Sequence, residues 1–251
     1  MFLPLFAVAI IMTPILGLLS MLLDSENTAL ALVSGFSMGG YVLILVALGI
    51  ASFVLIFIRF YRSTAKDEGY LLFTLPAKTI DILFSKLIVS VIWEIASAIV
   101  IGLSILVFTY MHGVWSFNQV SSLWDKISAL LTMKGYGNIP LLFSLYLISM
   151  LISTISGTLQ VFASIGLGQT MKNHRVAFSI MYYVISYIII QTISTIALIP
   201  FMLVNESSSS TTVMVNYQLG FLGISAVLSL LYGVAFFFVA NYCYKKKLNL
   251  E

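Results

Sequence analysis

The sequence predicts an all-α fold: a polytopic membrane protein with six transmembrane helices. Three observations support this class. Hydrophobic residues make up 61% of the chain, charged residues only 8%, and the mean hydropathy is +1.09. A chain of 251 residues cannot hide so much apolar surface in one water-soluble core. Since one span needs roughly 20 apolar residues, the length leaves room for six spans and modest loops.

Six apolar runs follow one another along the chain and form a single predicted transmembrane domain over residues 1–251. The first run carries no charge and lacks the basic n-region and small-residue cleavage site of a signal peptide, so we expect a span, bent near Pro14. Pro140 suits the first turn of the fourth helix. The predicted spans cover residues 2–23, 32–58, 87–110, 140–168, 177–204 and 219–242.

The basic residues predict the orientation of the spans, because Lys and Arg flanks stay in the cytoplasm. With both termini inside, ten of the twelve Lys and Arg residues are cytoplasmic, and only Lys126 and Lys134 are outside. Both termini are therefore predicted to be cytoplasmic, as is the loop 59–86. The segment 111–139 is predicted to be extracellular, and its apolar residues at helical spacing are typical of a helix lying on a membrane face.

The loop from Arg59 to Lys86, called the charged hinge here, holds five of the twelve basic and three of the nine acidic residues. Asp67 and Glu68 stand where a short helix could begin, and acidic side chains there accept hydrogen bonds from unpaired amides. Pro76 would end this helix. Apolar residues would project from it as a knob: Tyr70, Leu71 and Leu75. A knob rimmed by charges is typical of a protein interface, and the alternative is a hinge folded back under its own bundle.

Several kinds of chemistry are not expected from this chain. It contains no HExxH, GxSxG or GxxxxGK[ST] motif, no predicted span contains a His, and no paired acids could hold a metal at membrane depth. Neither His112 nor His174 has a second ligand type at metal spacing. A single Cys excludes a disulfide within the chain, and a scattered net charge of +3 does not favour nucleic acid.

Glu94 is the one ionisable residue well inside a predicted span, about 10 Å beyond Leu87. A charge near the centre of a span costs about 2.5 to 3.5 kcal/mol on insertion scales. This carboxyl group should therefore face protein or water, or be protonated. Two interpretations remain open: contact with a substrate or proton, or a hydrogen bond that ties helices together. The same alternatives apply to two weaker candidates, Gln160 and Gln191.

The charged hinge resembles the first cytoplasmic loop of bacterial type-2 permease subunits of ATP-binding-cassette (ABC) transporters. The resemblance rests on the run DEGYLLFTLP at residues 67–76, a basic residue shortly after it, and ILFSKL leading into a span. Members of that family have six spans, both termini inside, and a coupling helix between spans two and three that docks onto a separate ATP-binding subunit. The resemblance assigns this contact to seven residues: Asp67, Glu68, Gly69, Tyr70, Leu71, Leu75 and Pro76.

The resemblance implies an exporter subunit in the bacterial plasma membrane. It would pair with a second permease subunit, as a homodimer or heterodimer, above two ATP-binding subunits that carry ATP and Mg²⁺. Spans two and five line the pathway in relatives, which would place four residues near it: Tyr41, Gln191, Thr192 and Thr195.

The mostly apolar spans favour an amphipathic or hydrophobic cargo, such as an antimicrobial peptide, a lipid or a drug. Two other functions remain open on the sequence. One is an ATPase-independent carrier or channel that uses Glu94, and the other is a non-transporting membrane scaffold or sensor.

Overall fold

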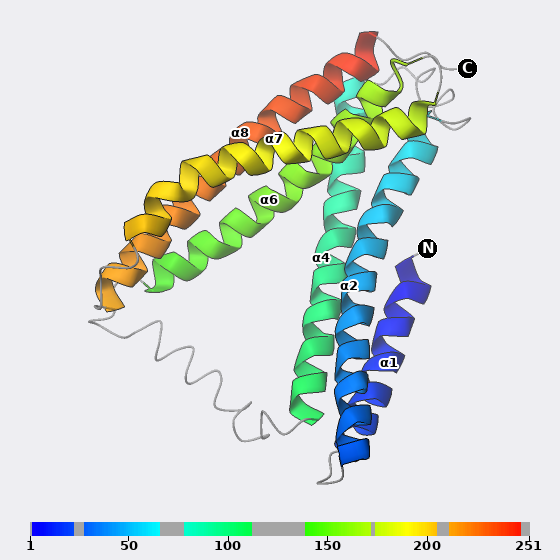
Figure 1. Ribbon diagram of the computed structural model, residues 1–251. Coiled ribbons are helices and arrows are strands. Elements are labelled where there is room, and N and C mark those ends of the chain that lie inside the picture. The colour runs from blue at the N-terminus through cyan, green and yellow to red at the C-terminus, as the bar shows by residue number, and fades with distance from the viewer. Residues whose placement is uncertain are drawn as a thin grey trace. The chain divides into compact units, whose positions relative to one another are not determined.

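The computed structural model of the protein describes residues 2–22, 28–65, 78–111, 139–171, 174–204 and 211–246. The regular structure in these residues is entirely helical, which confirms the predicted all-α class (Figure 1). The described helices are α1 (Phe2–Leu22), α2 (Thr28–Ala65), α4 (Thr79–Met111), α6 (Ile139–Gly168), α7 (Arg175–Val204) and α8 (Thr211–Lys246).

Five stretches of the described helices are long and apolar enough to cross a membrane: Gly35–Thr64, Thr79–Met111, Pro140–Gly168, Arg175–Pro200 and Tyr217–Lys245. The first helix contributes a shorter apolar stretch, Pro4–Leu19. Large apolar side chains point away from the protein, and Phe36 and Leu43 are 79% and 70% exposed. Contiguous apolar surface is rare on soluble monomers and ordinary against lipid. The chain is thus a multi-pass membrane protein.

Several helices run beyond the predicted spans. The 38 residues of α2 extend over roughly 57 Å at 1.5 Å per residue, whereas the hydrocarbon layer is about 30 Å thick. Likewise, α4 begins at Thr79 rather than at Leu87. The carbonyl of Lys78 accepts hydrogen bonds from the amides of Asp81 and Ile82, and the acidic side chain in the first turn favours the helix N-terminus. The length of an apolar run predicts the part of a helix that crosses the membrane. The helix itself can continue past that run, to the residues that cap it.

The described residues fall into two compact units. Unit 2 spans Phe60–Val91 and Ile127–Glu251. Its central helix is α6, which packs against both α7 and α8. Val161, Phe162 and Ile165 of this helix are fully buried.

The approach of α6 to α8 depends on small residues. A side chain at Gly233 would meet the hydroxyl of Ser156 at 2.6 Å. That hydroxyl donates a hydrogen bond of 2.6 Å to the carbonyl of Ser229. Close backbone approach together with interhelical hydrogen bonds is how helices associate in lipid.

Unit 1 spans Met1–Arg59 and Ile92–Lys126, and its described helical parts belong to α1, α2 and α4. The helix α1 is continuous through Pro14. Three buried hydroxyl groups join the helices. Ser104 Oγ lies 2.6 Å from Thr13 Oγ1 and 3.0 Å from the Tyr41 hydroxyl.

Candidate functional site

The seven hinge residues assigned to ATPase docking lie outside the described residues: Asp67, Glu68, Gly69, Tyr70, Leu71, Leu75 and Pro76. The segment 112–138, predicted to carry an outer amphipathic helix, lies outside them as well. The structure does describe the two ends of the hinge, residues 60–65 and 78–86, which we call its flanks, and both belong to unit 2.

The N-terminal flank of the hinge is held by a cluster of four residues, Phe60, Thr64, Phe162 and Tyr244, which we call the hinge anchor. The ring of Phe60 stacks on that of Phe162, with centroids 3.6 Å apart and planes 11° apart. It also meets the edge of the Tyr244 ring at 5.8 Å. The Tyr244 hydroxyl donates a 3.1 Å hydrogen bond to the carbonyl of Phe162. Thr64 is buried and donates to the carbonyl of Phe60 at 2.6 Å.

The hinge anchor therefore attaches the last turns of α2 to α6 and α8. Stacked aromatic pairs contribute about 0.5 to 1.5 kcal/mol beyond the burial of their area. Close-packed protein interiors resist deformation and transmit displacement.

The C-terminal flank of the hinge is also packed into unit 2. Ile82, Leu83 and Leu87 in the first turns of α4 are buried. The rings of Phe84 and Phe237 lie 5.2 Å apart, which joins the start of α4 to α8.

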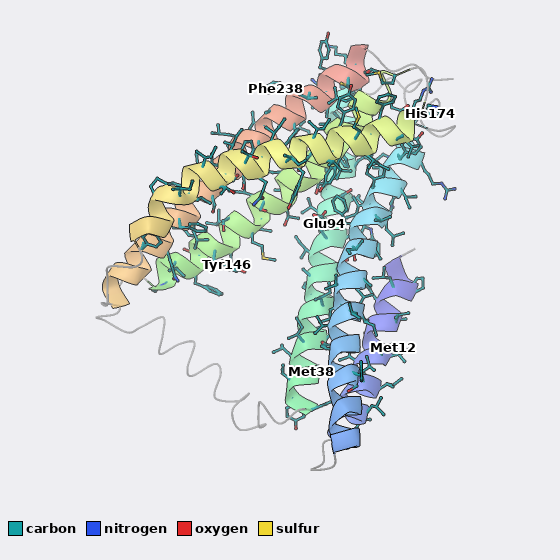
Figure 2. All side chains as sticks on the ribbon, viewed as in Figure 1. Met12, Met38, Glu94, Tyr146, His174 and Phe238 are labelled. Carbon is teal, nitrogen blue, oxygen red and sulfur yellow. The ribbon has the colours of Figure 1, made fainter. Side chains whose placement is uncertain are left out.

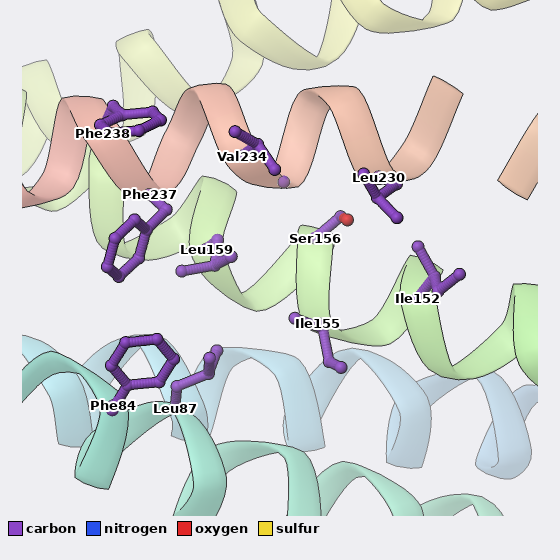
Figure 3. A pocket seen from close by; sticks show the side chains of 11 residues that line it. Phe84, Leu87, Ile152, Ile155, Ser156, Leu159, Leu230, Val234, Phe237 and Phe238 are labelled. Atoms are coloured by element: carbon purple, nitrogen blue, oxygen red, sulfur yellow. The ribbon is translucent and has the colours of Figure 1, made fainter. Parts of the chain in front are cut away.

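A largely apolar cavity of about 390 Å³ lies beside this flank (Figure 3). Phe84 and Leu87 of α4 line one side of it, and residues of α6 and α8 line the rest. The only polar side chain in the lining is that of Ser156, whose proton is already donated to the carbonyl of Ser229. The volume is within the range of small-molecule pockets, and the lining suits an apolar group.

A second cavity, of about 220 Å³, lies in unit 1 between α2 and α4, and we call it the Glu94 cavity. Glu94 lies near the middle of α4 and is half-buried (Figure 2). The cavity is lined by Gly49, Ser52, Phe53, Glu94, Ser97, Ala98 and Ile101.

Both serine hydroxyls in this lining donate to their own helix. Ser52 Oγ donates to the carbonyl of Leu48 at 2.8 Å, and Ser97 Oγ donates to the carbonyl of Trp93 at 2.8 Å. Sequence reasoning identified Glu94 but missed both serines. A signal for Ser97 was present, because a residue three positions after Glu94 lies on the same helix face. No such signal pointed to Ser52, which lies on another helix.

Gln160 and Tyr41 have the geometry of helix–helix contacts. Gln160 is buried, and its amide donates to the Ser186 hydroxyl at 2.9 Å, which joins α6 to α7. Tyr41 is buried, bonded to Ser104, and stacked on Phe108 with ring centroids 3.8 Å apart. Sequence reasoning also missed Thr13 and Ser104.

The three polar residues predicted on the fifth span lie on the exposed surface of α7. The hydroxyl of Thr192 donates to the carbonyl of Ile188, and that of Thr195 to the carbonyl of Gln191, both at 2.8 Å. These bonds leave the hydroxyl oxygens able to accept but not to donate.

Within the described ranges, no group of three or more His, Cys, Asp or Glu side chains could hold a metal ion. No protein-family model, curated protein or solved structure matches the chain. The resemblance of the hinge to type-2 permeases thus stays a prediction from the hinge sequence.

Proposed function

We propose that the chain is the membrane-spanning permease subunit of an ATP-driven ABC exporter in the bacterial plasma membrane. The charged hinge would serve as a coupling helix against a separate ATP-binding subunit, with Tyr70 and Leu71 as its central contacts. Two such subunits, carrying ATP and Mg²⁺, would drive a pair of permease subunits, the second being another copy or a related chain. Both termini would be cytoplasmic, as the distribution of Lys and Arg predicts.

The observation that carries this proposal is the packing of both hinge flanks into unit 2. A loop can move a helix bundle only if its ends are firmly attached to that bundle. Otherwise the attachment deforms and the helices stay in place. Phe60 joins the end of α2 to α6 and α8, and Phe84 joins the start of α4 to α8. A force applied to the hinge would therefore displace α6 and α8, as a rigid-body transition requires.

The linings of the two cavities support an amphipathic or hydrophobic cargo. The cavity beside Phe84 offers almost only carbon atoms. The Glu94 cavity adds one carboxyl group and two hydroxyls. Neither lining contains a Lys or Arg side chain, the usual partners of sugar phosphates and other anions.

Purification of the tagged chain from membranes of its native host tests the coupling role. We expect an ATP-binding subunit to copurify with ATPase activity. Leu71→Asp should reduce the copurified activity at least tenfold, because a charge in the centre of an apolar interface costs about 2 kcal/mol or more. Leu123→Asp is the matched control, since it makes the same change in the predicted extracellular segment.

Unchanged ATPase recovery with Leu71→Asp, in a chain that still inserts into the membrane, would contradict the docking role of the hinge. The two alternative functions predict other results. A self-sufficient carrier would transport in liposomes without any ATPase. A scaffold or sensor would bind a partner through the hinge without stimulating ATP hydrolysis.

A further inference from the structure

We propose that the Glu94 cavity recognises the ammonium group of an amphipathic amine, which makes lipophilic amines the cargo class. The role of the amine as cargo rests on the export function proposed above. Binding itself follows from the donors and acceptors that line the cavity.

The two serine hydroxyls that line the Glu94 cavity can accept hydrogen bonds from a ligand but cannot donate them. A serine hydroxyl has one proton to donate, and both lining serines donate it to a backbone carbonyl of their own helix. Their oxygens therefore present only lone pairs to the cavity. In its ionised form, Glu94 adds a carboxylate as the third acceptor, and no side chain in the lining then carries an N–H or O–H proton that is free to be donated. An ammonium group carries three N–H donors, which matches this set.

The remaining lining favours an organic cation over a metal ion. Calcium takes six to eight oxygen ligands, and magnesium requires a near-ideal octahedron. The other lining side chains, those of Phe53, Ala98 and Ile101, offer no oxygen at all. The ring of Phe53 can instead attract a cation through its face.

Because the cavity lies deep in the membrane, a ligand that reaches it must carry its amine on an apolar group. Glu94 lies roughly 22 Å along α4 from Thr79, near the middle of a membrane-crossing helix. The headgroup of a membrane lipid stays at the surface and does not reach this depth. With a volume of about 220 Å³, the cavity is also smaller than pockets that enclose a whole drug-sized ligand. It therefore holds a head group, while the apolar remainder lies along the exposed helix faces.

Labelling with dicyclohexylcarbodiimide, an apolar reagent for carboxyl groups, tests this inference on the purified full-length chain. The chain is placed in phosphatidylcholine nanodiscs, because a choline headgroup has no N–H donor. Modification of Glu94 is then quantified by mass spectrometry in the presence of n-decylamine or n-decanol, and the carbodiimide adduct is counted together with the decylamide that a primary amine forms from the activated carboxyl group. We expect n-decylamine to protect Glu94 and the neutral alcohol to give no protection. Glu94→Gln should abolish the modification at this position.

A pair of glycine variants separates filling of the cavity from general effects on the fold. Nothing lies within 4 Å of a side-chain carbon built at Gly49 or at Gly39, so both positions on α2 have room for a side chain. Gly49 lines the cavity and Gly39 does not. Gly49→Leu should raise the n-decylamine concentration that gives half-protection by about tenfold or more. This is the loss of affinity expected when the added side chain blocks charge-assisted hydrogen bonds to the amine. Gly39→Leu should leave it unchanged.

Absence of labelling at Glu94, equal protection by n-decanol, or an equal effect of the two glycine variants would each overturn the proposal. The assay contains no ATP-binding subunit. Its failure therefore leaves the docking test on Leu71 unaffected, and a failed docking test leaves amine binding at Glu94 intact.

Discussion

Gly168 allows the end of α6 to approach the start of α7. A side-chain carbon at this position would lie 2.7 Å from the amide nitrogen of Ser179 and 2.8 Å from the carbonyl oxygen of Arg175. These are backbone atoms in the first turns of α7, so they cannot rotate away as a side chain could. Next to this contact, His174 has a φ of 53°, in the left-handed region, which His visits more readily than most residues. Gly168 and His174 therefore constrain the backbone at the end of α6 and at the start of α7.

Gly168→Ala should destabilise the protein by about 1 to 3 kcal/mol, the usual cost of overpacking. The control is Gly157→Ala on the same helix, where nothing lies within 4 Å of the added carbon. There Ala should stabilise by about 0.5 to 1 kcal/mol, because it lowers the entropy lost when the helix forms. Denaturant unfolding of the two variants in the same detergent measures the difference. Equal stability of the two would show that the close contact at Gly168 does not exist.

A chain of three hydroxyl groups joins the helices within unit 1. Thr13 donates its only proton to the carbonyl of Ala9 at 2.7 Å. Ser104 must therefore donate to Thr13, and Tyr41 must donate to Ser104. This chain of hydrogen bonds links α1, α2 and α4. Of its three residues, Ser104 is the one that bonds to both other helices.

Ser104→Ala should therefore destabilise unit 1 by about 1 kcal/mol, since it removes two interhelical bonds that average roughly 0.6 kcal/mol each in membrane proteins. Thr109→Val on the same helix is the matched control. Its hydroxyl bonds only to carbonyls of its own helix, at Ile105 and Leu106, so its loss should be nearly neutral. The free energy of unfolding in bicelles distinguishes the two variants. If both variants cost the same, the network contributes nothing between helices.

The membrane acts on the whole molecule, because lipid solvates the outward side chains of both units. Successive helices that cross a membrane place their connecting segments on alternate sides, and the Lys and Arg residues predict which side each segment occupies. The exposed residue Lys78 precedes α4 at the end of the hinge and is predicted to be cytoplasmic. Ser208 belongs to the serine-rich link between α7 and α8, predicted to be outside.

Single cysteines at these positions test the orientation in intact cells. Ser208→Cys should react with a membrane-impermeant maleimide, and Lys78→Cys should react only after the cells are permeabilised. The single native cysteine, Cys243, is buried and should contribute little background. The reverse labelling pattern would place the hinge outside the cell, where no ATP-binding subunit could reach it.

Sequence reasoning alone predicted the all-α class and the order of the long apolar helices, because both depend on local composition and on the solvent that surrounds the chain. The predicted spans stop short of the ends of α2, α4 and α8, because these helices continue through polar turns that lie outside the hydrocarbon layer. Glu94 was also found from sequence, since a lone carboxyl group in an apolar run is conspicuous.

Only the tertiary structure decided which side chains meet. Ser52 joins Glu94 in one cavity, Thr13 reaches Ser104 across 91 positions, and Phe60 stacks on Phe162. The physical reason is that contacts between helices depend on how each helix is rotated about its axis. An amphipathic helix reveals its rotation through its polar face, but these helices are apolar on nearly every side. Their rotation is set by packing against neighbouring helices, so it cannot be predicted from the sequence of one helix alone.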